Sequence, residues 1–235
     1  YHDGVNNWNL INGMLFQQKE TDIDSDGSDE IEIQIVEGRI VVENDDMDEL
    51  FSVLFDDANL AGISDDQSYL WAVGPPNNKI FEIWSKNNLD NPVSCRHNKS
   101  ISSIHIHPNS NSIYIGHNDG SIQLNKLDKP CTLSKNMNGQ HGGSILFISV
   151  SDDGKRVFSK GIDHISKYWN VENGQLLAST ISLQHNHQWA VVSPNGQFDK
   201  SPDFNGLHFT QGFNVIGLDQ FFDDHHLQIY KFHPN

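Results

Sequence analysis

The chain has 235 residues, a mass of 26.5 kDa, a formal net charge of -16 and 36% hydrophobic residues. No apolar run approaches the roughly 18 residues of a membrane-spanning helix, so the chain is not expected to enter a membrane. Two cysteines, Cys95 and Cys131, are too few for a disulfide framework, which favours a reduced, cytoplasmic protein. At this length an all-β chain can bury its core as a single domain, here residues 1–235.

The negative charge is local. Residues 20–57 hold 15 of the 31 acidic residues and one base, Arg39. The rest of the chain is nearly neutral and has no basic stripe, so binding to nucleic acid through its phosphates is not expected. The segment instead predicts acidic, solvated loops and, as a partner, a protein with a basic surface.

Short apolar runs separated by Asp, Asn and Gly turns recur along the chain, which predicts an antiparallel all-β fold. Residues 2–16 are expected to form two strands, with Trp8 on the first and Asn12-Gly13 between them. Their partner strands are expected either upstream of Tyr1 or among the C-terminal strands. Because the chain opens at Tyr1 without Met, it is expected to be a piece of a longer protein.

The acidic segment is expected to contain a hairpin. Ile31, Ile33 and Ile35 alternate with polar residues, which predicts a half-buried strand, and Glu37-Gly38 turns it into a second strand, residues 39–42.

A candidate calcium loop precedes this hairpin. Asp22, Asp24 and Asp26 alternate and are followed by Gly27, as at the opening of a calcium-binding loop. The twelfth position holds Ile33 where such a loop needs a bidentate Glu. Calcium therefore stays open as a ligand, and no other cofactor is expected.

Two sets of apolar runs follow in residues 50–133. The first set, residues 50–88, reads LFSVLF, LAGIS, YLWAV and KIFEIW, and its Trp71 and Trp84 are expected in the core. The second set, residues 94–133, places His105 and His107 on one strand face, where they are expected to face solvent rather than a zinc ion.

Residues 141–181 give the clearest set. Four short runs, ILFISV, RVFSK, ISKYWN and LLASTI, are separated by Asp, Asn and Gly turns. Four residues within it resemble the hydrogen-bonded tetrad of a WD repeat, the blade of a β-propeller: His141, Ser159, Asp163 and Trp169. This resemblance implies that the four side chains satisfy one another inside the blade.

The spacing of these residues repeats. His97, His141 and His185 are each 44 residues apart, and Asp119 and Asp163 are also 44 apart. A period of about 40–45 residues is typical of propeller blades. We therefore expect a β-propeller of four-stranded antiparallel blades, with about five blades or as part of a larger propeller.

About 40 residues of the C-terminal segment, residues 187–227, resemble the terminal module of bacterial WD-repeat proteins that continue into a caspase-like peptidase domain. The matching residues are Trp189, Pro194, Gly196, Phe198, Asp199, Gln220 and Phe221. A short helix is expected over residues 218–227. The resemblance implies that any peptidase domain would lie beyond Asn235.

No motif marks an active site, because the chain has no Gly-rich phosphate loop, G-x-S-x-G elbow or Cys-His motif. We expect a non-catalytic protein–protein interaction or scaffold module of a larger, bacterial effector or signalling protein. Two alternatives stay open: a metal-dependent, lactonase-like propeller hydrolase using Asp22, Asp24 and Asp26, and a purely structural domain packed on a neighbouring peptidase domain. The expected partner is a protein with a basic surface or the chain's own downstream domain.

Overall fold

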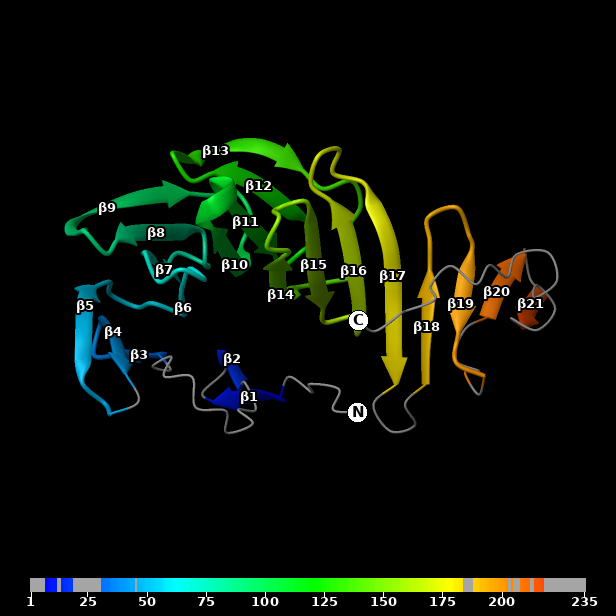
Figure 1. The fold of residues 1–235 in the computed structure, drawn as a ribbon, viewed down its shortest axis with the longest axis horizontal. Coiled ribbons are helices and arrows are strands. Elements are labelled where there is room, and N and C mark those ends of the chain that lie inside the picture. The colour runs from blue at the N-terminus through cyan, green and yellow to red at the C-terminus, as the bar shows by residue number, and fades with distance from the viewer. Residues whose placement is uncertain are drawn as a thin grey trace. The chain divides into compact units, whose positions relative to one another are not determined.

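A computed structural model describes residues 7–11, 14–18, 31–44, 46–183, 188–202, 204, 208–211 and 214–217. These residues form antiparallel strands, β1 to β21, and one 3-10 turn, Pro108–Ser110. The predicted all-β fold of antiparallel four-stranded sheets is confirmed (Figure 1). The helix expected over residues 218–227 lies outside the described residues, and no described helix is long and apolar enough to cross a membrane.

The chain divides into two compact units, Tyr1–Ile101 and Ser102–Asn235. The first unit holds three sheets: a hairpin, a three-stranded sheet and a four-stranded sheet. Their strands are β1 (Asn7–Ile11) and β2 (Met14–Gln18), then β3 (Ile31–Val36), β4 (Arg39–Asn44) and β5 (Glu49–Leu54), then β6 (Leu60–Ile63), β7 (Tyr69–Gly74), β8 (Ile80–Ser85) and β9 (Asn88–Arg96).

Strand β5 corrects the assignment made from sequence. The run LFSVLF was expected to belong with the strands that follow it, but β5 pairs with β4 and the next sheet begins at Leu60. An apolar run identifies a strand without saying which neighbour it pairs with. The predicted turn at Glu37-Gly38 forms, with both residues at positive φ, and joins β3 to β4.

The core of the first unit lies between these two sheets. Ile40, Val42 and Val53 pack with Leu70, Ala72 and Trp84, and the alternating isoleucines of β3 border the cluster. Trp84 is buried edge-on against Phe55, with ring centroids 5.9 Å apart. Trp71 and Trp84 are core residues, as expected.

The second unit holds a four-stranded sheet, a six-stranded sheet and a hairpin. The strands are β10 (Ile101–His107), β11 (Ser112–His117), β12 (Ile122–Lys126) and β13 (Lys129–Asn136), then β14 (Ile145–Val150), β15 (Arg156–Gly161), β16 (Ile165–Asn170), β17 (Leu176–Leu183), β18 (Gln188–Val192) and β19 (Phe198–Lys200), then β20 (His208–Gln211) and β21 (Asn214–Gly217).

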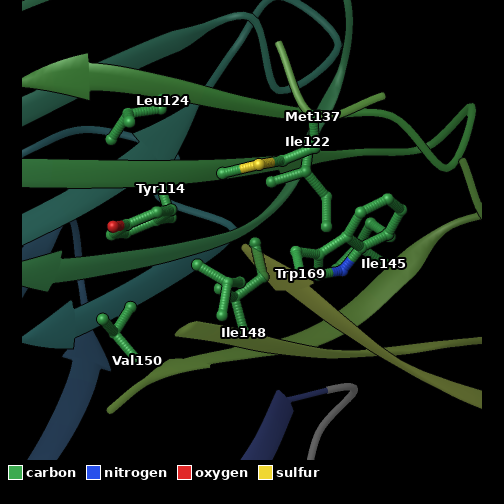
Figure 2. Close-up of a cluster of buried hydrophobic side chains, with 9 residues drawn as sticks. Tyr114, Ile122, Leu124, Met137, Ile145, Ile148, Val150 and Trp169 are labelled. Atoms are coloured by element: carbon green, nitrogen blue, oxygen red, sulfur yellow. The ribbon is translucent and has the colours of Figure 1, made fainter. Parts of the chain in front are cut away.

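A hydrophobic cluster joins the two larger sheets of this unit. Tyr114, Ile122, Leu124 and Met137 meet side chains of β14 and β16, and Trp169 lies at one side of the cluster (Figure 2). Its other members are Ile145, Ile148, Val150 and Val157. The sheets therefore stack face to face, as propeller blades do.

The six-stranded sheet departs from the expected repeat. The spacing of His185 predicts the start of a new blade, but residues 184–187 lie outside the described residues and β18 pairs with β17. Strand β19 then adds to β18, and Ala190 and Phe198 form a small core with Phe204. The outer strand β17 thus has a neighbour on each side.

Three tight turns between strands share one hydrogen-bonded design. In Ser151-Asp152-Asp153-Gly154, Ser151 Oγ donates to Asp153 Oδ1 (2.7 Å) and accepts from Arg156 N (3.1 Å), while Lys155 N donates to Asp153 Oδ1 (3.0 Å). Ser64 and Asp66 form the same pattern, and Ser193 donates to Asn195 in the turn between β18 and β19. These short polar side chains cap the tight turns, so each hairpin is defined locally.

The cysteines depart from expectation. Cys95 lies on β9 and Cys131 on β13, and both are disulfide-bonded. The expectation of reduced thiols is wrong, because a low cysteine count excludes a framework of several bridges without excluding bonded cysteines. The cytoplasmic location that rested on it stays a prediction.

Candidate functional site

The structure brings the four residues of the sequence-based tetrad together in the second unit. Ser159 comes from β15 and Trp169 from β16, which are adjacent antiparallel strands. Asp163 lies in the turn that joins them, and His141 precedes β14. His164 at positive φ closes that turn, with its N–H donating to Gly161 O (3.1 Å).

The four side chains form one continuous hydrogen-bonded chain. His141 Nδ1 lies 3.1 Å from Asp163 Oδ1, and His141 Nε2 lies 2.8 Å from Ser159 Oγ. Trp169 Nε1 donates to the same Ser159 Oγ over 2.8 Å. Ser159 and Trp169 are fully buried, and the His141 side chain has no exposed surface.

The donors and acceptors fix the tautomer of His141. Asp163 is a carboxylate, so His141 Nδ1 must carry the proton that it donates. Nε2 of a neutral ring then accepts from the Ser159 hydroxyl. The hydroxyl can make both bonds, because it donates its hydrogen to His141 and accepts from Trp169 Nε1–H with a lone pair. Burial lowers the pKa of His141 despite the opposing effect of Asp163, so the neutral ring is favoured at neutral pH.

Asp163 is held by backbone as well as by His141. Its Oδ2 accepts from Gly142 N (2.7 Å) and its Oδ1 from Ile165 N (3.1 Å). Burial alone would raise the pKa of Asp163, but these two bonds and the bond from His141 together lower it. The carboxylate is therefore charged and fully engaged at neutral pH.

The β15 backbone at Gly161 lies close to two of the tetrad side chains. A Cβ at Gly161 would lie 2.6 Å from both Asp163 Oδ1 and His141 Nδ1. The close approach of the β15 backbone therefore requires a glycine at this position.

The connectivity Ser159–His141–Asp163 is that of a nucleophilic Ser-His-Asp triad. A nucleophile must reach its substrate, and Ser159 is fully buried with its oxygen occupied by the Trp169 indole. The arrangement thus favours a role in holding strands β15 and β16 to the segment before β14.

Corresponding positions in other sheets show how the repeat has diverged. Trp84, Asn125 and Trp169 each pair with the second residue of the preceding strand, Leu70, Ile113 and Val157. Asn125 is buried and donates through Nδ2 to Pro130 O (2.6 Å). Where the indole is replaced, a side-chain to backbone bond takes over part of its role.

The residues at the tetrad Asp and His positions of the other sheets have different partners. Asp119 accepts from Ser121 N (3.0 Å) and Ser121 Oγ (2.6 Å). Asn78, at the tetrad Asp position before Trp84, accepts from Asn59 Nδ2 (2.8 Å). His97 packs against the Phe81 ring at a centroid distance of 5.3 Å.

The two histidines of β10 do not face solvent, so that prediction is wrong for them. His107 is buried and its Nδ1 bonds Ser110 Oγ (2.8 Å), while His105 is half-buried with its Nε2 shielded from water. The alternation of Ile and His was read as one apolar and one solvated face. In this strand both faces are covered, so polar side chains are buried on one of them.

The metal hypothesis stays a prediction. Asp22, Asp24 and Asp26 lie outside the described residues. Within the part of the chain that the structure describes, no group of three or more His, Cys, Asp or Glu side chains is placed to hold a metal ion.

The residues of the C-terminal resemblance are partly described. Phe198 is buried in the small core with Ala190, Trp189 is 38% exposed, and Gly196 has positive φ in the turn. Gln220 and Phe221 lie outside the described residues. The local hairpin thus forms, while the rest of the module stays a prediction.

Sequence reasoning missed two features. It did not find that β5 pairs with β4, because the run LFSVLF looked like the start of the next sheet. It also missed the side-chain caps of the turns, whose signal was the recurring Ser-x-Asp or Ser-x-Asn spacing at Ser64, Ser151 and Ser193.

Comparison with known proteins supports the fold alone. No family model matches the chain, and no curated protein matches it. A chain in a crystal structure of the mitotic checkpoint complex is similar, with a TM-score of 0.52 and 13% sequence identity over 66% of this chain. The match covers 53% of that chain, so the present chain spans about half its length. Together with the stacked antiparallel sheets, this likeness shows a WD-repeat-like β-propeller fold.

Proposed function

We propose that the chain is a non-catalytic protein–protein interaction module. The tetrad is the observation that carries this proposal. His141, Ser159 and Asp163 are the described residues with the connectivity for nucleophilic chemistry, and all three bond one another inside the blade. Residues engaged in this way stabilise a scaffold, which leaves the exposed loops and strand edges for binding.

The finer proposal concerns the parent protein and the partner. The C-terminal resemblance, carried by Trp189, Pro194 and Phe198, supports a bacterial effector or signalling protein with a downstream caspase-like domain. The acidic segment, residues 20–57, supports a partner with a basic surface. The purified chain should then retain a defined protein partner saturably, and raised salt should weaken that retention.

Affinity capture with a matched variant tests this proposal. The wild-type chain and a variant with the Asp and Glu of residues 20–57 replaced by Asn and Gln are immobilised in parallel, and retained proteins are quantified by mass spectrometry. We expect partners enriched on the wild type and depleted on the variant. Equal retention of partners by both chains would contradict binding through the acidic segment. If neither chain retains a specific partner, the result would favour a purely structural domain.

An activity screen tests the hydrolase alternative. The chain is assayed on esters and lactones with and without calcium, zinc and magnesium, and calcium binding is titrated by calorimetry. We expect no turnover above the uncatalysed rate. A tightly bound divalent ion together with turnover that falls in an Asp22, Asp24 and Asp26 to Asn variant would overturn the proposal.

A further inference from the structure

The three-stranded sheet of the first unit stops where its neighbour has one more strand. β3 lies beside β6, the first strand of the next sheet, so β3 corresponds to a first strand. β5, two strands further along its own sheet, then corresponds to the third strand. In the sheet of β6 to β9, β9 pairs with the outer edge of the third strand. Among the described strands β5 pairs with β4 alone, which leaves its other edge open (Figure 1).

The backbone of β5 offers hydrogen bonds at this edge. Phe55 N donates to Gly38 O (3.0 Å), so the Phe55 backbone faces the strand β4 side. Backbone direction alternates along an antiparallel strand, so the N–H and C=O groups of Leu54 and Ser52 point toward the open edge. An extended peptide could bond to these groups as a fourth strand.

The fourth strands of the three larger sheets are protected in ways that β5 is not. β9 contains Pro92 and β13 contains Pro130. β17 is covered by β18. Proline and added strands are common means of blocking an edge, and β5 contains no proline.

The exposed side chains of β5 define the chemistry of a partner. Leu54 is 75% exposed, on the face opposite the core residue Val53, and Leu50, at the register shift of the strand, is 45% exposed. Exposed acidic residues lie at both ends of the strand: Asp46, Asp48, Glu49, Asp56 and Asp57. Arg39 bonds Ser52 and lies 3.6 Å from Glu49, so one acid is compensated. A second copy pairing edge to edge would place like charges opposite one another, which is unfavourable.

We propose that the open edge of β5 binds an extended segment of a partner protein that alternates apolar residues and carries basic residues at both ends. The proposal rests on the interaction function above and names the partner's chemistry. Backbone bonds to the β5 edge would supply affinity, Leu50 and Leu54 would contact the apolar side chains, and the flanking acids would select basic ends.

A defined peptide tests this binding on the full 235-residue chain. The probe is a fluorescein-labelled nonapeptide with Lys-Arg at each end and Ile-Thr-Val-Thr-Ile between, and binding is followed by fluorescence anisotropy. Control peptides carry Glu-Glu at each end, or N-methyl groups on alternate backbone nitrogens. We expect saturable binding of the probe and at least tenfold weaker binding of either control.

Two matched protein variants separate backbone from side-chain contributions. Leu54→Pro removes one outward N–H without touching the bond from Phe55 N, and Leu54→Ala keeps that N–H. We expect about tenfold weaker binding for Leu54→Pro and a smaller loss for Leu54→Ala. Replacing Asp48 and Asp57 with Asn should weaken binding several-fold and reduce its salt dependence.

Several outcomes would overturn the proposal. These are no saturation at millimolar protein, equal binding of the N-methylated peptide, or equal binding by Leu54→Pro when its circular dichroism matches that of Leu54→Ala. If Leu54→Pro does not fold, the N-methylated peptide on the wild-type chain decides. Affinity capture of a partner that survives these changes would reject the β5 edge and leave the interaction function standing.

Discussion

Replacing Ser159 with Ala should destabilise the second unit strongly, although it removes a single oxygen atom. Ser159 Oγ receives Trp169 Nε1 and bonds His141 Nε2, both over 2.8 Å. The variant leaves a buried indole N–H and a buried imidazole nitrogen without these partners. Each such loss costs about 1–3 kcal/mol, so the free energy of unfolding should fall by roughly 2–6 kcal/mol. That is a large share of the ~5–15 kcal/mol that stabilises a typical domain.

Urea unfolding followed by circular dichroism and tryptophan fluorescence measures this change. Ser166→Ala is the control, because Ser166 lies one strand away on the opposite face of the sheet and is only partly buried. It should change the free energy of unfolding by less than ~0.5 kcal/mol. A loss below about 1 kcal/mol for Ser159→Ala would refute the reasoning.

A double-mutant cycle separates the Ser159–Trp169 bond from general packing. Trp169→Phe removes the indole donor and also opens space in the core, so it should be destabilising by itself. If the hydrogen bond contributes to stability, the double variant should lose less free energy of unfolding than the two single variants together, by about 1 kcal/mol or more. Strict additivity would show that the two residues act independently.

Two further changes probe the same network. His141→Gln should reduce the loss of stability in acid. Burial lowers the pKa of His141 below its usual 6.5, so the unfolded chain binds the proton first and wild-type stability falls as the pH drops below about 6.5. Protonation of Asp163, whose pKa is also lowered in the folded chain, adds a further loss below pH 3.8. Urea unfolding at pH 7.5 and 5.0 should show a smaller difference between the two values for the variant than for the wild type, and an unchanged difference would contradict the assignment. Gly161→Ala should lower the free energy of unfolding by about 1–3 kcal/mol, because the added methyl carbon would lie 2.6 Å from Asp163 and His141. A thermal midpoint equal to that of Ser166→Ala would show that the backbone can relax.

The hydrogen-bonding role of a residue was predictable from the sequence where residues close to it in the chain determine that role. His141, Asp163 and Trp169 lie at fixed distances from tight turns, so their spacing survives as a readable pattern. The Ser and Asp residues of the turns carry the same kind of information. The antiparallel all-β fold followed from these signals together with the period of 44 residues.

Longer-range pairing was not predictable in the same way. The run containing Leu50 and Leu54 is a strand in either arrangement, and only its hydrogen-bonded neighbour distinguishes the two. The same holds for β18, which joins β17 although its sequence spacing indicates a new blade. His107 was misjudged because strand alternation shows which residues share a face, without showing whether another sheet covers that face.

The capped turns at Ser64, Ser151 and Ser193 bear on how the chain folds. Each one closes a hairpin through bonds among residues at most five apart in sequence. Such hairpins can fix their strand register early in folding, before segments distant in the sequence come into contact. The slower step is then the association of the preformed hairpins. A mutation in one of these turns should delay the formation of its own hairpin while the others form at their usual rate.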